Sequence, residues 1–87
     1  MAFHIPNTNL RFGFAKATNT FGNHGYVCTI FLSTPVDHII ACEAAFCDSR
    51  DYWNPDRGRK LALAKALTAA GLLKAERELF WEVYHTR

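Results

Sequence analysis

The chain has 87 residues, of which 49% are hydrophobic, 14% aromatic and 21% charged. This balance fits one globular domain spanning residues 1–87 and excludes a disordered or low-complexity protein. The formal net charge of +2 is too small to indicate nucleic-acid binding by itself, but the charge is unevenly placed, because residues 50–65 alone carry +3.

The first half of the chain predicts three strands. Residues 10–17 alternate large apolar side chains with small or charged ones, which is typical of a half-buried strand. Residues 26–33 are β-branched or aromatic on both faces and therefore predict a central strand. Residues 38–47 predict the third strand, although their alanines also suit a helix. A turn signal at 23–25 separates the first two strands, and another at 34–37 separates the second and third.

The second half predicts two helices. Asn54, Pro55 and Asp56 suit the N-cap, the first position and the first turn of a helix, which we expect to cover residues 55–70 and to end at Gly71. A second helix is expected over residues 73–84, with Leu79, Phe80 and Val83 on its apolar side. The element order predicts an α+β fold, in which a three-stranded antiparallel sheet is followed by a two-helix hairpin packed on one face.

The start of the first predicted helix combines free backbone N–H groups with Arg57 and Lys60, a combination that can form an anion site. These two residues lie on the outer stripe, so they either contact a partner or form a solvated face. Arg59 instead falls on the apolar stripe, where a charge must be paired. We expect Arg59 to form a structural ion pair with Asp51, or with Asp48, in the preceding loop, and a ligand role is the alternative.

Two aromatic residues are candidates for partner contact. Trp81 lies between Lys74 and Glu78 on the helical wheel, away from the apolar side of the second helix. A tryptophan exposed beside charged groups is typical of an interface anchor, and the alternative is that Trp81 folds under the C-terminal residues. Tyr52, in the loop before the first helix, poses the same choice between contact and burial.

The sequence contains no convincing catalytic or metal-binding pattern. The three cysteines are an odd number, and no two of them form a C-x₂-C pair, so neither a disulfide framework nor a metal site is expected. The carboxylates do not suggest an acid–base pair, and we expect a protein that is not an enzyme and needs no cofactor. No run approaches the roughly 18 apolar residues of a membrane span, and no secretory signal is evident, which favours an intracellular location without membrane contact.

The second half of the chain resembles a pattern found in small phage and prophage accessory proteins. The residues that carry this resemblance are Cys47, Asp51, Trp53, Gly58, Arg59, Leu61, Ala62, Lys65 and Leu67. The resemblance implies a stoichiometric inhibitor of host defence, a class that includes anti-CRISPR proteins, acting in the cytoplasm of a bacterial host. The chain is also similar to double-stranded-RNA-binding domains, with Arg59 and Lys60 standing where those domains have a lysine pair.

Three functions follow from these observations. The leading one is an inhibitor that binds a host defence protein or ribonucleoprotein and blocks its nucleic-acid or effector site through Arg57, Lys60, Trp81 and Tyr52. The alternative is direct binding of nucleic acid by the basic N-terminus of the first helix. A third is a structural or homodimeric module with no ligand, because the central strand is apolar on both faces and the core is small.

Overall fold

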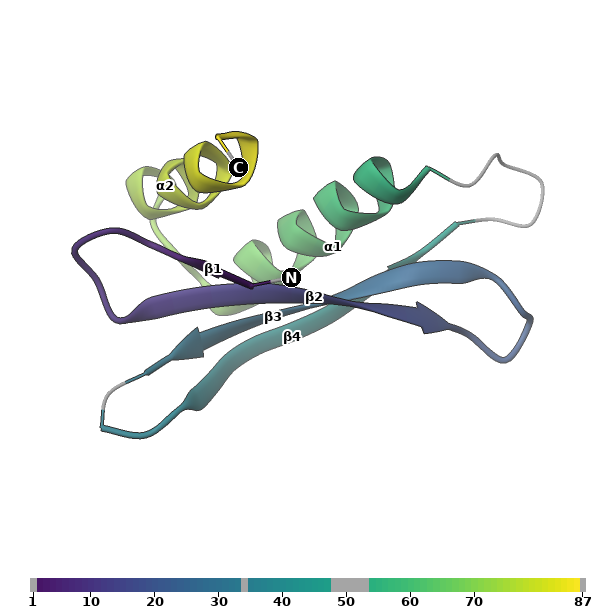
Figure 1. The fold of residues 1–87 in the computed structure, drawn as a ribbon, viewed down its shortest axis with the longest axis horizontal. Coiled ribbons are helices and arrows are strands. Elements are labelled where there is room, and N and C mark those ends of the chain that lie inside the picture. The colour runs from purple at the N-terminus through teal and green to yellow at the C-terminus, as the bar shows by residue number, and fades with distance from the viewer. Residues whose placement is uncertain (1, 34, 48–53, 87) are drawn as a thin grey trace.

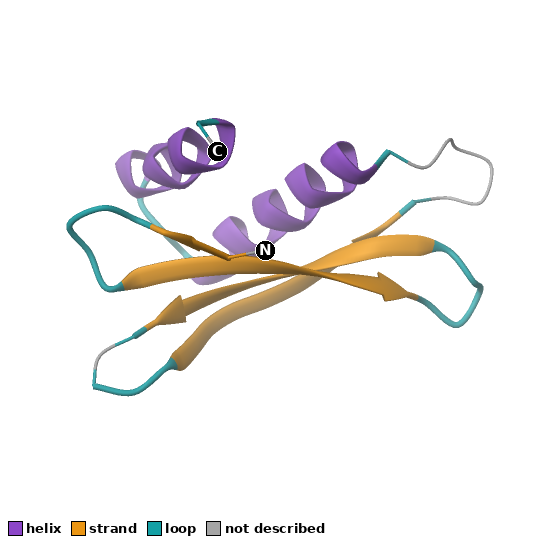
Figure 2. Ribbon diagram, viewed as in Figure 1, coloured by secondary structure: helices purple, strands orange, loops and turns teal. Residues whose placement is uncertain are grey.

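The computed structural model describes residues 2–33, 35–47 and 54–86. Four strands precede two helices: β1 (Ala2–His4), β2 (Leu10–Thr18), β3 (His24–Leu32), β4 (His38–Phe46), α1 (Pro55–Ala70) and α2 (Lys74–His85). The strands form one antiparallel sheet in the order β1-β2-β3-β4 (Figure 1). Both helices lie on the same side of this sheet, so the α+β fold has one layer of each kind (Figure 2).

The sheet has four strands, whereas the sequence predicted three. β1 was missed because three residues are too few to show an alternating pattern. It is held by its pairing with β2, since Phe3 lies opposite Phe12 in the antiparallel register and their rings stack with centroids 4.8 Å apart. The other three predicted strands are confirmed to within two residues at each end. The turn expected at 23–25 is wrong in part, because β3 already begins at His24.

The core lies between the helices and one face of the sheet. The buried side chains of α1 are Ala62, Leu63, Ala66 and Leu67, which form the apolar stripe on which Arg59 was expected. On α2, Phe80 and Val83 pack on the core as predicted, but Leu79 is 43% exposed and Tyr84 is fully buried, so the apolar side is rotated from the prediction. Tyr84 lies one turn after Phe80; the Tyr84 ring packs against Phe3 of β1 and Phe14 of β2, and the Phe80 ring packs against Phe12 of β2. The largest fully buried side chains are Tyr84, Phe12, Phe80, Ile5, Ile30, Leu63 and Leu67.

The ends of α1 agree with the prediction. The Asn54 side chain caps the helix by accepting a hydrogen bond from the Arg57 N–H at 3.2 Å. Gly71 ends the helix with φ of 67°, a left-handed conformation that glycine adopts without steric cost. The second helix begins at Lys74, one residue later than predicted, where the Glu76 carboxylate accepts from the Leu73 N–H at 3.0 Å.

The other face of the sheet is covered by none of the described elements, and we call it the open face. The register places on it the strand positions that alternate with the core, and in a solvated sheet these positions are usually polar. Here the central rows are apolar or small and include Gly13, Ala15, Val27, Thr29, Cys42 and Ala44.

Candidate functional site

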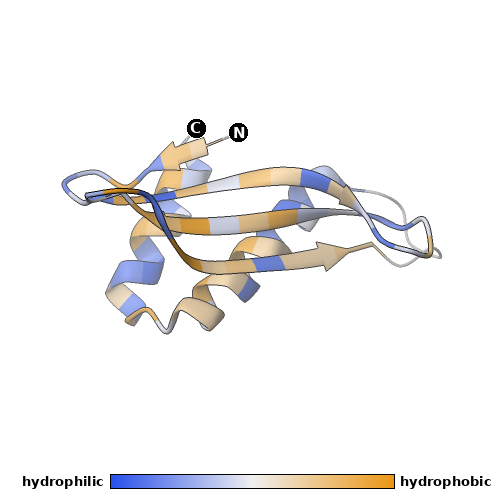
Figure 3. Ribbon diagram, turned by 90° about the horizontal axis from the view of Figure 1, so that it is seen from below, coloured by the Kyte–Doolittle hydropathy of each residue, from blue (hydrophilic) through white to orange (hydrophobic). Residues whose placement is uncertain are grey.

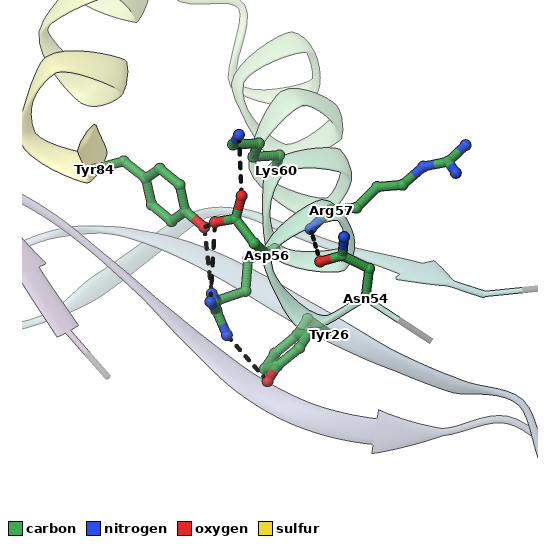
Figure 4. Close-up of polar contacts among 7 residues, drawn as sticks. Tyr26, Asn54, Asp56, Arg57, Lys60 and Tyr84 are labelled. Atoms are coloured by element: carbon green, nitrogen blue, oxygen red, sulfur yellow. Dashed lines mark hydrogen bonds and ion pairs between the residues drawn. The ribbon is translucent and has the colours of Figure 1, made fainter. Parts of the chain in front are cut away.

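The polar groups at the start of α1 form a network that joins both helices to the sheet. The Tyr84 hydroxyl donates to Asp56 Oδ1 at 2.6 Å and accepts from Arg59 Nε at 3.3 Å. Arg59 also donates from a terminal guanidinium nitrogen to the Tyr26 hydroxyl at 3.2 Å, and its guanidinium lies over the Tyr26 ring. Because α1, α2 and β3 each contribute, this network fixes the position of the helix N-terminus on the sheet (Figure 4).

Arg59 points toward the sheet, as its place on the helical wheel predicted. The Asp51 predicted as its ion-pair partner lies outside the described residues, as does Asp48. Among the described residues, Asp56 lies 3.9 Å from Arg59 and supplies a carboxylate from within the same helix. The hydrogen bond that Arg59 donates to the Tyr84 hydroxyl is the main cause that raises the pKa of Arg59, so this side chain keeps its charge. Arg59 is therefore committed to structural contacts.

The candidate contact residues Arg57 and Lys60 point in different directions. Lys60 Nζ lies 3.0 Å from Asp56 Oδ2, on the side of α1 that faces Tyr84. Arg57 extends away from this cluster, and its side chain is exposed (Figure 4). The two cations therefore do not converge on one anion site, and the Asp56 carboxylate offsets much of the positive charge at this helix end.

Trp81 is neither a fully exposed anchor nor a fully buried side chain. It is partly buried and packs against the core, with its ring edge-on to Tyr84 at a centroid distance of 6.2 Å. It also stacks with the ring of His85, and the two ring centroids lie 6.0 Å apart. Its part in partner binding stays a prediction. Tyr52 lies outside the described residues.

The turn between β2 and β3 displays an aromatic residue that the sequence analysis missed. Phe21 is 86% exposed, the highest value among the large hydrophobic residues of the described chain. The Asn19 side chain holds this turn, because its Oδ1 accepts from the N–H groups of both Phe21 and Asn23 at 2.9 Å. Gly22 completes the turn with φ of 80°. A single phenylalanine among Asn, Thr and Gly residues was the sequence signal that could have revealed it.

Phe21 and Arg57 lie toward the same end of the molecule. The Arg59–Tyr26 contact places the first turn of α1 over the start of β3, directly after the turn that carries Phe21. The ribbon shows this turn and the N-terminal end of α1 at the same end of the long axis (Figure 1). Lys16, which pairs with Tyr26 across β2 and β3, is exposed near the end of β2 that leads into this turn. We call Lys16, Phe21 and Arg57 the turn-end surface.

The titratable groups do not form a reactive centre among the described residues. Burial raises the pKa of the Cys28 thiol to about 12, with a smaller contribution from Cys42, so Cys28 is protonated at neutral pH. In residues 2–33, 35–47 and 54–86, His, Cys, Asp and Glu side chains form no group of three or more that could hold a metal ion. No described helix is long and apolar enough to cross a membrane.

Comparisons with known family models, characterised proteins and solved structures find no match to this chain.

Proposed function

We propose that this protein is a non-enzymatic inhibitor of the phage type, which binds a protein or ribonucleoprotein of a bacterial defence system through the turn-end surface. The observation that carries the proposal is Phe21, an aromatic side chain held in solvent by an ordered turn. Exposing an aromatic ring to water has a free-energy cost that a binding partner can recover.

The turn supports binding because its conformation is already fixed. Asn19 accepts two backbone hydrogen bonds, and the Gly22 N–H donates to the Asn19 carbonyl at 3.0 Å. A partner that receives Phe21 in an apolar pocket therefore loses little affinity to ordering of the loop. Aromatic anchors surrounded by polar groups are typical of the residues that dominate the binding free energy of an interface.

The cations of the turn-end surface define the complementary partner. Lys16 and Arg57 are both exposed, so the rim of the partner's pocket should carry carboxylates or phosphates. In a defence ribonucleoprotein, both an acidic protein surface and a bound nucleic acid can supply such groups. Occupying that position would block the nucleic-acid or effector site by exclusion, without any chemical reaction.

Affinity capture tests the proposal. The tagged protein is incubated with bacterial lysate, with and without nuclease, and the captured material is identified by mass spectrometry. The proposal expects a nuclease-resistant defence component. Material that is captured only without nuclease, and that dissociates steeply with salt, would assign the function to direct nucleic-acid binding instead.

Variants then locate the contact on the identified partner. Phe21→Ser should cost about 2 kcal/mol or more of binding free energy, which raises Kd by roughly 30-fold or more. Val36→Ser is the matched control, because Val36 is 62% exposed in the turn between β3 and β4. Trp81→Ala tests the other candidate anchor. Full affinity of Phe21→Ser with loss of affinity in Trp81→Ala would place the contact on α2 and refute the turn-end surface.

A further inference from the structure

We infer that the open face of the sheet is a homodimer interface, on which a second copy of this chain packs face to face. This inference is independent of the turn-end surface, because it concerns the opposite side of the sheet from the helices. Seen from below, the sheet lies in front of the helices and most of its length is coloured as apolar or neutral (Figure 3).

The composition of the open face is the first observation that supports a dimer interface. Its central rows combine Gly13 with Thr29 and Cys42, and Ala15 with Val27 and Ala44. Strand positions that face water in a monomer usually carry polar side chains, so this pattern is typical of a sheet packed against another apolar surface. Among the described strand positions of this face, Arg11 is the charged residue, and it lies in the end row that also holds His4, Phe31 and Ile39.

The shape of the open face favours a second copy as the occupant. Ile39, opposite Phe31 in the register, protrudes from this face with 65% of its surface exposed. A shallow hollow of about 310 Å³ lies on the same face, over Gly13; Ala15, Thr29 and Phe31 help to line it, and so does Arg11. A two-fold interface requires a protruding group and a receiving hollow on one patch, so that each copy supplies both. We place Ile39 of each copy in the hollow of its partner.

The charge of the face is compatible with self-association. The described strand positions of the open face carry no carboxylate, so an acidic or strongly basic partner would find few complementary charges there. Two copies face each other through uncharged central rows, and each Arg11, an end-row residue that also lines the hollow, can keep its guanidinium in water through its long side chain.

The area of the face is sufficient for a specific dimer. Three strands of nine residues span about 30 Å each at about 3.3 Å per residue, and neighbouring strands lie about 4.8 Å apart. With the short β1, the footprint is about 500 Å² per copy, or about 1,000 Å² in total, which is the lower limit for a biological interface. Sheets packed in this way lie about 10 Å apart.

Sedimentation velocity and light scattering on the full chain test the dimer. Wild-type protein should have twice its 9.9 kDa chain mass at about 100 µM and dissociate on dilution. Ile39→Glu and, separately, Ala15→Glu should raise the dimer Kd by about tenfold or more, because a carboxylate is forced into an apolar contact. Leu73→Glu is the matched control, since Leu73 is 72% exposed next to α2 and should leave the dimer intact.

A thiol readout identifies the face directly. Cys42 is exposed on the open face, where its sulfur lies 3.5 Å from the Thr29 hydroxyl. Its reaction rate with a thiol reagent should fall as wild-type concentration rises, and should not fall in Ile39→Glu. A wild-type monomer at about 100 µM would overturn the inference and assign the face to another occupant. Equal dissociation of Ile39→Glu and Leu73→Glu, with both variants folded by circular dichroism, would also overturn it.

Discussion

Removing one hydroxyl group, in Tyr84→Phe, tests the network that positions α1. The Tyr84 ring is fully buried and stays in place in the variant, so no cavity larger than one oxygen atom forms. What is lost is the donor to Asp56 at 2.6 Å and the acceptor of Arg59 Nε at 3.3 Å. The variant therefore isolates the polar contribution to stability.

The expected magnitude follows from the exposure of the two partners. A hydrogen bond to a charged group contributes about 1.5–3 kcal/mol, and the lower value applies to Asp56 because 43% of its side chain is exposed to water. Arg59 is only 15% exposed, so its guanidinium regains less hydration when the hydrogen bond is lost, and this adds to the loss of unfolding free energy. We expect a total loss of about 2 kcal/mol, or roughly 10 °C in Tm for a chain of this size.

Urea unfolding followed by circular dichroism measures this loss. The midpoint should fall while the m-value is unchanged, because the surface exposed on unfolding is the same. Tyr26→Phe is the control, since it removes a single 3.2 Å contact with Arg59 and should cost about half as much. A Tyr84→Phe variant within about 0.5 kcal/mol of wild type would show that the network does not hold the helix end, and would refute the reasoning.

Three further predictions test the sheet, the turn and the buried titratable groups. Gly25→Ala should destabilise the fold by about 1–3 kcal/mol, because the added Cβ would overlap the Ala45 carbonyl on the neighbouring strand; an unchanged urea midpoint would contradict the β3–β4 register. Asn19→Ala should weaken binding of a confirmed partner, because the ordered turn is lost, and should lower the free energy of unfolding by about 1 kcal/mol. Unchanged affinity of this variant would show that binding does not depend on an ordered turn. Burial raises the pKa values of Cys28 and Tyr84, so both groups bind protons more tightly in the folded chain than in the unfolded chain. The free energy of unfolding should therefore be fully retained below about pH 9 and fall as the pH rises toward 12. A urea midpoint that does not fall over this alkaline range would contradict their burial.

Local signals in the sequence were sufficient for α1 and for the three long strands. Asn54 and Gly71 define the helix ends through their own side chain and backbone conformation, so no distant residue is needed to predict them. β1 was missed because its three residues depend on pairing with β2, and α2 was rotated because the Tyr84 hydroxyl bonds to groups 25 and 28 residues away in the chain.

The candidate site was predictable only in part. The inward direction of Arg59 followed from helical periodicity, but its contacts with Tyr84 and Tyr26 depend on how α2 and β3 pack, which no local pattern encodes. Phe21 was overlooked because turn residues were interpreted as connections between strands. Its exposure becomes evident only when Asn19 is seen to fix the turn that carries it.

The most direct test of the account is phage plating on bacteria that carry an active defence system and express this protein. Wild-type protein and the Val36→Ser control should restore plating on at least one such host, and Phe21→Ser should not, although all three accumulate as folded protein. Restoration by Phe21→Ser as efficient as by wild type would contradict the turn-end surface, and failure of wild-type protein to restore plating against any defence system would contradict the proposed inhibitor function.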